Sequence, residues 1–482
     1  MRSVVCLAVL LGATTVQADT AEDLANYLRL RDRLQSEFVI EGEGQGEGIP
    51  AHLRIEEAGL VRWADATIDL GWYMGVLATE LAMLDAPTRY PGLTGNADET
   101  AERLYEALAA LERLDRIADA SFVEPECTQA ESLNGFFIRD DVPGDFHLRF
   151  GATQTRSDFL DPVVTNKEMS QDQVWHLMLG LSLTARFAGE RTVRGRRLQS
   201  WAREQALRIM AFVAEDDWRI SNPACGDRSV ARGSGAVGNA PGGAAIVEFL
   251  SEGGIPANVQ PNQQRLFDTL QDPEHAVYIN PDNMHMVMTI VAVGRGFGDE
   301  SAASLMALAE VHDWWLYPLL YGALRTDEEA PRWCMHRVRA SAGAATLLGE
   351  LGANEPRSPQ PARAEHSFTT SNRFIRPSDF AYVGMDGSEG HRYHGLDFML
   401  LHNLRAIADP NSWEGGDAPG PGACRPVPPD AGVPDAGSDA AVDAGASDAG
   451  EMATGGGGCA VSSSTSGPLA GLFALLWFRR RR

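Results

Sequence analysis

The feature that most constrains the fold of this chain is a set of helical segments that are apolar around their whole circumference. Residues 60–84, 174–183 and 396–401 are almost wholly apolar, yet each follows or begins with a polar or charged turn. A helix that is apolar on all sides must be buried on all sides. Amphipathic segments such as residues 98–118 alternate with them and repeat leucine at helical spacing. Buried helices enclosed by amphipathic ones predict two concentric layers.

Helical periodicity covers most of the chain and leaves few candidate strands. The helical segments are 19–38, 60–84, 98–118, 168–188, 195–214, 236–250, 283–294, 301–317, 330–351 and 396–407. The short stretches 136–139 and 146–150 could form small hairpins within loops. The fold class is therefore predicted to be all-α, with small loop hairpins.

This pattern of helices resembles the six-hairpin α/α toroids of glycoside hydrolases and polysaccharide lyases. The resemblance extends over residues 19–408, a length within reach of one large toroid. It implies that the polar first turns of the inner helices meet at one end of the ring. The chain carries no catalytic motif specific to such a family, and an irregular helical bundle or solenoid is the alternative.

The N-terminus is typical of a secretion signal. Arg2 precedes an apolar run from Val4 to Ala13, and Val16 and Ala18 are the small residues that a signal peptidase requires. The run is too short to span a bilayer. Residues 1–18 are therefore predicted to be a signal peptide, cleaved after Ala18 by signal peptidase.

The C-terminal part is predicted to be a linker followed by a sorting tail. Residues 409–458 repeat Asp-Ala-Gly and hold almost no apolar bulk, so they predict a disordered linker. Residues 459–482 begin with Cys459, continue with a short apolar stretch and end in four arginines. This tail resembles the MYXO-CTERM signal of myxobacteria, which implies processing by a myxosortase-like enzyme and outer-membrane anchoring through Cys459. An ordinary C-terminal membrane anchor is the alternative.

The net charge limits the classes of partner, and the cysteine content bears on the compartment in which the protein folds. The net charge of −25 argues against nucleic acid as a partner. Cys127, Cys225, Cys334 and Cys424 remain between the signal peptide and the tail, and an oxidising location permits disulfides among them. Proline lies near both Cys127 and Cys225 in loop-like segments, which favours that pair.

Four carboxylates are the candidate catalytic residues. Asp140 and Asp141 lie in a loop beside aromatic residues, and Glu168 and Asp172 share one face at the start of a helix. Paired carboxylates serve glycoside chemistry as acid, base or nucleophile. A solvated turn or a calcium ligand is the alternative for the first pair, and helix capping for the second.

A further set of residues is predicted to bind substrate. An aspartate within an apolar helix, such as Asp69, must be paired or functional. Histidines before apolar runs could hydrogen-bond a sugar or form part of the core, and His391, His394 and Asp397 also have a spacing that could present metal ligands. Because no H-E-x-x-H motif is present, neither a metal nor a cofactor is predicted. The substrate-binding candidates are Trp72, Asp69, Gln173, His285, His391 and His394.

These observations favour a surface-anchored protein that processes extracellular polysaccharides or oligosaccharides. A glycoside hydrolase using the paired carboxylates is the leading hypothesis. A polysaccharide lyase on the same scaffold, with a histidine or tyrosine as base, is the second. A non-catalytic protein that binds glycans or cell surfaces is the third.

Overall fold

A computed structural model describes the central part of the chain. The described residues are 21–63, 66–121, 131–157, 159, 167–215, 288–289, 291–293, 300–312, 314–325, 331–352 and 391–409. The predicted signal peptide, the helix at 236–250, the linker beyond residue 409 and the sorting tail with Cys459 lie outside them. His285, Asp65, Cys127, Cys225 and Cys424 lie outside them too. None of the described helices is long and apolar enough to cross a membrane.

The described part of the chain is mostly helical, as predicted. Residues 21–37 form the first helix. The longer helices that follow are α2 (Ala66–Leu84), α3 (Ala97–Ser121), α4 (Gln171–Phe187), α5 (Leu198–Glu215), α10 (Glu300–His312), α11 (Leu316–Leu324), α12 (Pro331–Gly352) and α14 (Leu396–Ala408). Two predicted boundaries were wrong. Residues 60–62 form a strand rather than the start of α2, and the helix predicted at 301–317 is two helices that break at Trp314 and Trp315.

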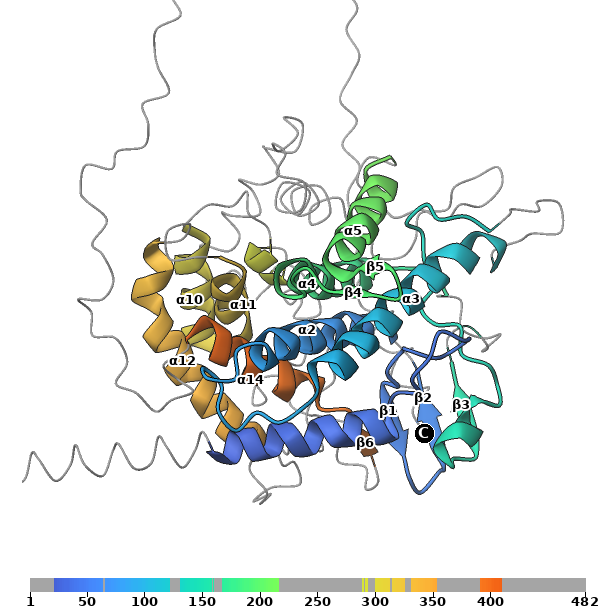
Figure 1. Cartoon of the computed structure of the whole chain (residues 1–482), viewed down its shortest axis with the longest axis horizontal. Coiled ribbons are helices and arrows are strands. Elements are labelled where there is room, and N and C mark those ends of the chain that lie inside the picture. The colour runs from blue at the N-terminus through green and yellow to red at the C-terminus, as the bar shows by residue number, and fades with distance from the viewer. Residues whose placement is uncertain are drawn as a thin grey trace, which may run out of the picture. The chain divides into compact units, whose positions relative to one another are not determined.

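Helices α2, α4 and α14 run parallel to one another at the centre of the structure (Figure 1). Gly71 of α2 lies against His176 and Gly180 of α4, and Gly75, one turn further along, lies against Leu183. Along α14, Leu400 approaches Gly75 and Asn403 donates to the Val76 carbonyl, so the same order holds. The segments that the sequence shows as apolar on all sides lie in these helices, and residues 66–81, 174–183 and 396–401 are all buried.

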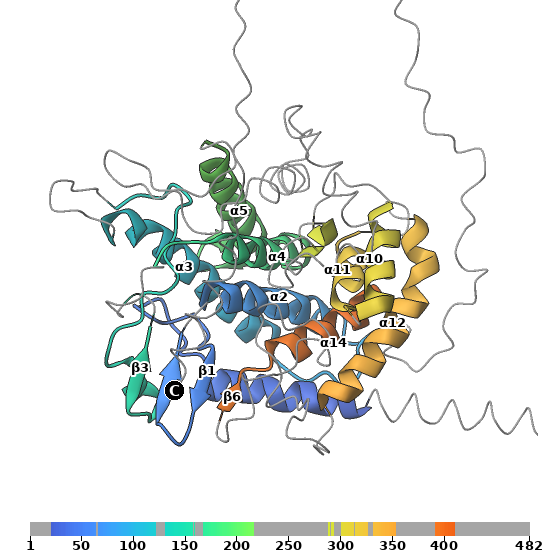
Figure 2. The same ribbon diagram turned by 180° about the vertical axis from the view of Figure 1, so that it is seen from behind.

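Amphipathic helices run antiparallel beside the central ones (Figure 2). The start of α3 lies at the end of α2, where Thr100 donates to Glu80 at 3.1 Å. The helix at 21–37 runs antiparallel to α14, with Asp23 beside Arg405 and Phe38 beside His394. The first and last helices of the described chain are therefore neighbours.

A small sheet covers the end of the structure where the central helices begin. Its strand order is β3 (Gln154–Arg156), β2 (Leu60–Arg62), β1 (Leu53–Ile55) and β6 (His391–Tyr393). The β1–β6 pair is antiparallel, and so is the β1–β2 pair, whereas β2 and β3 are parallel. The sheet joins residues separated by more than 300 positions, so local sequence patterns do not predict it.

The predicted loop hairpins take other forms. Residues Phe146–Phe150 form a 3-10 helix, η1, rather than a strand. In the stretch 136–139, Ile138 makes a single antiparallel bridge to Glu168. The one tight hairpin among the described residues joins β4 (Thr192–Val193) to β5 (Arg196–Arg197), just before α5.

Cys334 at the start of α12 is disulfide-bonded. Because Cys127, Cys225 and Cys424 lie outside the described residues, the predicted Cys127–Cys225 pair stays a prediction.

Candidate functional site

Three buried side chains meet where the sheet joins the central helices. His52 Nδ1 lies 2.8 Å from one carboxylate oxygen of Asp69, and His394 Nε2 lies 3.2 Å from the other. Asp69 and His394 are fully buried, whereas the His52 side chain retains 8% of its exposure. His52 is therefore the member of this His–Asp–His cluster that reaches closest to the outside.

Strand pairing brings the two histidines together. In the β1–β6 pair Leu53 is opposite Tyr393, so the preceding His52 and the following His394 reach the same end of the sheet. Gly395 then adopts a left-handed conformation with φ of 80° and turns the chain into α14. Asp69 comes from the first turn of α2, which begins four residues after β2 ends.

The ionisation states of the cluster follow from burial and hydrogen bonding. Burial by itself would raise the pKa of Asp69, but the two histidines outweigh it and hold that pKa well below its usual range. Burial lowers the pKa of His394, and the attraction of Asp69 offsets only part of this effect. At neutral pH Asp69 is thus an ionised acceptor and His394 a neutral ring.

Hydrogen bonds also determine which ring nitrogens carry protons. The Leu396 N–H donates to His394 Nδ1 at 3.1 Å, so the proton of this neutral ring is on Nε2, which donates to Asp69. Because ionised Asp69 only accepts, His52 Nδ1 must also donate to it. In neutral His52 the nitrogen that can accept a proton is therefore Nε2.

The same three residues have the composition of a metal site. Their ligand atoms all lie within 4.8 Å of one another, and two imidazoles with a carboxylate are a common donor set. However, a metal on His394 Nε2 would have to replace the proton that the Leu396 bond to Nδ1 keeps there. The contacts therefore fit a hydrogen-bonded His–Asp–His network better than a coordination sphere.

Three of the predicted residues, Glu168, Asp172 and Gln173, lie at the start of α4 or just before it. Ser170 and Gln173 form a capping box, and the carboxylate of Asp172 accepts from Ser170 Oγ and the Gln173 N–H. His176 Nδ1 donates to the Asp172 carbonyl at 2.6 Å. The backbone of Glu168 bridges Ile138, and its carbonyl accepts from Arg139. Helix capping, the alternative to a catalytic role for Glu168 and Asp172, accounts for the contacts of Asp172.

His176 connects the start of α4 with the His–Asp–His cluster. Its ring stacks on Trp72, with centroids 6.0 Å apart. Burial lowers the pKa of His176, while Asp172 and Asp69 act in the opposite direction. The charge of Asp69 thus reaches a residue of α4, which places the first turns of α2 and α4 in one polar region.

Asp140 and Asp141 are buried in the loop that precedes η1. Asp141 forms an ion pair with Arg113 at 2.6 Å and accepts the Gly46 N–H at 3.0 Å. Asp140 accepts from Ser157 Oγ and from the Val142 N–H. Asp141 thus holds the loop against α3 and the Gly-rich segment around Gly46, and Asp140 holds it against Ser157.

Sequence reasoning missed His52 and placed the other histidines only in part. His52 stands alone between Ala51 and Leu53, with no polar neighbour that signals a site. His391 lies in β6 opposite Ile55, and nothing further is described for its side chain. The pairing of β1 with β6 brings His52 and His394 to the same end of the sheet, where both contact Asp69.

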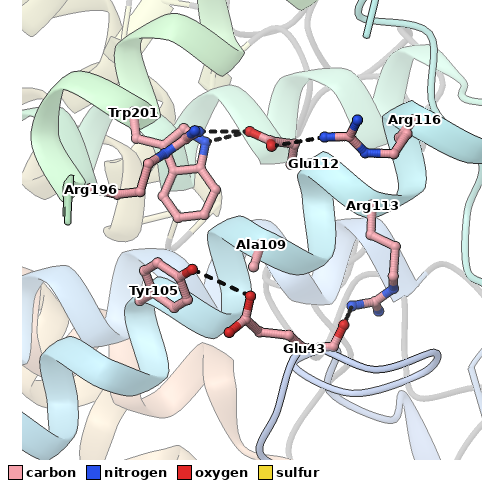
Figure 3. A pocket seen from close by; sticks show the side chains of 8 residues that line it. All are labelled: Glu43, Tyr105, Ala109, Glu112, Arg113, Arg116, Arg196 and Trp201. Atoms are coloured by element: carbon pink, nitrogen blue, oxygen red, sulfur yellow. Dashed lines mark hydrogen bonds and ion pairs between the residues drawn. The ribbon is translucent and has the colours of Figure 1, made fainter. Parts of the chain in front are cut away.

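A surface depression of about 260 Å³ lies beside α3, with Arg196 of β5 and Trp201 of α5 at its wall (Figure 3). It is lined by Glu43, Tyr105, Ala109, Glu112, Arg113, Arg116, Arg196 and Trp201. None of these residues belongs to the predicted site. The depression combines aromatic, cationic and anionic side chains, a composition that suits a polar ligand with an apolar face.

No protein-family model matches this sequence, and no curated protein or solved structure shows significant similarity to it. Function must therefore be inferred from the side chains themselves. The His–Asp–His cluster and the depression beside α3 are the two places where the described residues gather chemically useful groups.

Proposed function

We propose that this protein is an exported, surface-anchored enzyme that processes glycans, with an α/α-toroid body. Three parallel central helices with antiparallel helices beside them support the toroid, because inner and outer layers of a toroid are related in this way. The contact of the first helix with α14 brings the two ends of the body together, as closure of a ring requires. The predicted secretion signal and the predicted sorting tail support export and anchoring.

The observation that carries an enzymatic function is the His52–Asp69 pair. A buried carboxylate that accepts the Nδ1 proton of a histidine holds the ring in one tautomer and stabilises the imidazolium that forms when Nε2 takes a proton. His394 donates to the second oxygen of the same carboxylate and fixes its orientation. We assign His52 as the general base, with Asp69 and His394 as positioning residues.

The surroundings of the pair favour elimination, the chemistry of the lyase alternative. In that reaction His52 Nε2 would take the proton beside the carboxylate of a uronic acid. The electrons form the new C=C bond, and the glycosidic C–O bond breaks. The guanidinium of Arg33 lies close enough to lower the pKa of His394, and it would offset the substrate carboxylate. The leaving oxygen takes a proton from solvent or a nearby acid.

Hydrolysis is the second candidate, because Asp69 and Asp172 lie in the first turns of adjacent parallel helices. Two carboxylates at one end of a ring could act as the acid and base of a glycosidase. Elimination and hydrolysis leave different products: an unsaturated fragment in the first case and a fragment with one added water in the second.

The test is to incubate the full-length protein with neutral and uronic polysaccharides and to identify products by mass spectrometry. Under this proposal His52→Asn lowers turnover at least about 100-fold. His147→Asn is the matched control, since its ring bonds Gly144 and Thr155. A folded protein that cleaves none of the substrates would overturn the enzymatic proposal and favour glycan binding alone.

A further inference from the structure

The β4–β5 hairpin is strongly basic although the chain as a whole is acidic. Arg191, Arg194, Arg196 and Arg197 fall within seven consecutive residues of a protein with a net charge of −25. The turn is made by Arg194 and Gly195, with φ of 47° and 81°. Such turns normally take Asn or Gly, because a Cβ atom strains a left-handed residue by roughly 1 kcal/mol. Arg194 therefore adopts this conformation at a cost in backbone energy.

Two of these arginines cover an aromatic pair between α3 and α5. Arg194 lies 5.0 Å from the ring centroid of Tyr105, and Arg196 lies 4.2 Å from that of Trp201. The two rings are 5.2 Å apart and tilted by 52°. The hairpin thus forms a cationic rim beside an apolar wall, and Arg196 and Trp201 both line the depression.

Glu112 connects most of the donors in the depression. It accepts from Trp201 Nε1 at 2.6 Å, from Arg196 at 2.8 Å and from Arg116 at 3.2 Å (Figure 3). Two guanidinium groups therefore share one carboxylate, whereas Arg194 of the hairpin turn pairs with Glu43, Glu102 and Glu106. The side chains of Arg196 and Arg116 are 41% and 47% exposed, so both can reorient toward a ligand.

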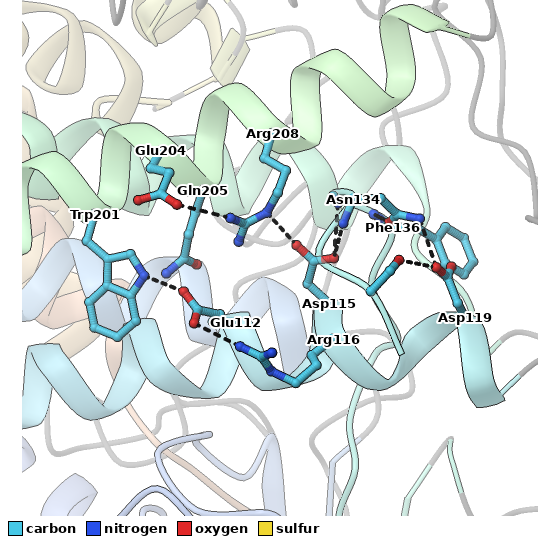
Figure 4. Close-up of polar contacts among 12 residues, drawn as sticks. Glu112, Asp115, Arg116, Asp119, Asn134, Phe136, Trp201, Glu204, Gln205 and Arg208 are labelled. Carbon is cyan, nitrogen blue, oxygen red and sulfur yellow. Dashed lines mark hydrogen bonds and ion pairs between the residues drawn. The ribbon is translucent and has the colours of Figure 1, made fainter. Parts of the chain in front are cut away.

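The wall of the depression is held rigid by contacts deeper between α3 and α5 (Figure 4). Arg208 of α5 forms an ion pair with Asp115 of α3 at 2.8 Å, and Gln205 donates to the Leu108 carbonyl at 3.0 Å. Asp115 also accepts the N–H groups of Asn134 and Gly135. These links fix Glu112 and Trp201 relative to each other, so the site is formed before a ligand arrives.

We propose that this depression binds one carboxylated sugar residue of an anionic glycan. Arg196 and Arg116 would bind the carboxylate, since guanidinium groups match its planar geometry. Glu43 and Glu112 would accept from sugar hydroxyls, and the Tyr105–Trp201 wall would contact the apolar face of the ring. A volume of about 260 Å³ suits a single sugar residue rather than a chain. The choice of ligand rests on the proposed glycan-processing function.

Binding is measured with full-length protein carrying His52→Asn, so that no ligand is consumed. The probes are a tri-uronate oligosaccharide and the same oligosaccharide with its carboxyl groups reduced, with titration followed by calorimetry. We expect the uronate to bind at least about tenfold more tightly. We expect Arg196→Gln and Arg116→Gln each to remove most of this preference.

Arg197→Gln is the matched control, because Arg197 lies on the same strand but pairs with exposed Glu190. It should change affinity by less than about twofold. Equal losses in the Arg196 and Arg197 variants would mean nonspecific charge attraction and would overturn the site. So would equal binding of the reduced oligosaccharide. If uronate binds as expected but the wild-type protein cleaves nothing, the binding site stands and the enzymatic proposal fails.

Discussion

At the scale of single residues, burial lowers the pKa values of His176, His394 and His402, so these rings are neutral at neutral pH. His402 of α14 stacks on Tyr27 with ring centroids 4.7 Å apart, and its Nδ1 lies 3.1 Å from the side-chain oxygen of Asn403. Burial lowers the pKa of His402 to about 4; the bond to Asn403 opposes this shift and the charge of Arg405 adds to it. The neutral ring of His402 is therefore part of the packing between α14 and the first helix.

The depressed pKa of His402 predicts sensitivity to acid. In the unfolded chain histidine has a pKa of about 6.5, so the unfolded state binds a proton first as the pH falls. The stability contributed by neutral His402 is therefore fully present above about pH 6.5 and is lost as the pH falls toward 4. His402→Phe keeps the stack on Tyr27 but cannot titrate.

We expect the variant to lose less stability than the wild type between pH 7.5 and pH 4.5, by about 2 kcal/mol. Urea unfolding at both pH values measures this difference. The pKa values of His176 and His394 are lowered as well, but both residues are present in the wild type and in the variant. Their contribution to the change in stability therefore cancels. If both proteins lose the same free energy of unfolding between pH 7.5 and pH 4.5, the lowered pKa of His402 is contradicted.

At the scale of elements, α2 and α4 approach closely enough that only glycine fits between them. A Cβ atom on Gly71 would overlap the backbone carbonyl of His176, and one on Gly180 would overlap the carbonyl of Gly71. Because these atoms are backbone, no side-chain rotation can relieve the overlap. The approach also sets the position of Asp69, which lies two residues before Gly71 in the same turn of α2.

We expect Gly71→Ala to destabilise the protein by about 1–3 kcal/mol or more, since the helices must separate. Gly349→Ala in α12 is the matched control, because nothing lies within 4 Å of a Cβ atom there. In an exposed helical position alanine should be neutral or stabilising by up to about 1 kcal/mol. Thermal and urea unfolding of both variants compare the two sites; similar effects would argue against a close helix contact at Gly71.

At the scale of the described body, segments from the two ends of the chain interlock. Strand β6 pairs with β1, and Arg405 of α14 forms an ion pair with Asp23 of the first helix. Tyr27 also donates to Glu80, while Asn403 donates to the Tyr27 hydroxyl at 3.3 Å. The first helix, α2 and α14 therefore form one buried polar and apolar contact, and none of them can complete the core alone.

This interlocking predicts that two C-terminal truncations of the chain differ sharply in thermal stability. A chain that ends at residue 390 lacks β6 and α14 and should not show a cooperative thermal transition. A chain that ends at Pro426 keeps them, together with Cys424, and should melt within about 2 °C of the full-length protein. Circular dichroism melting of both chains measures this. A cooperative transition in the shorter chain would show that the ends are not needed for closure.

The sequence predicts helices well where their apolar pattern is long, as in α2, α3, α4, α12 and α14. It fails at Leu60–Arg62, because a three-residue strand that runs directly into an apolar helix has no periodicity of its own. It also predicts that Asp69 must be paired or functional. It does not predict the partners, which are the side chains of His52 and His394.

What the sequence determined by itself is local: which segments are helical, which helices are buried on all sides, and which helix starts are polar. These properties depend on residue spacing within one or two turns. His52 and His394 are 342 positions apart in the sequence. Only the tertiary structure, through the pairing of Leu53 with Tyr393, decided that they would share the carboxylate of Asp69. It likewise placed Arg196 on Trp201 beside Glu112. The physical reason is that strand pairing and close helix packing bring together residues whose distance along the chain carries no signal.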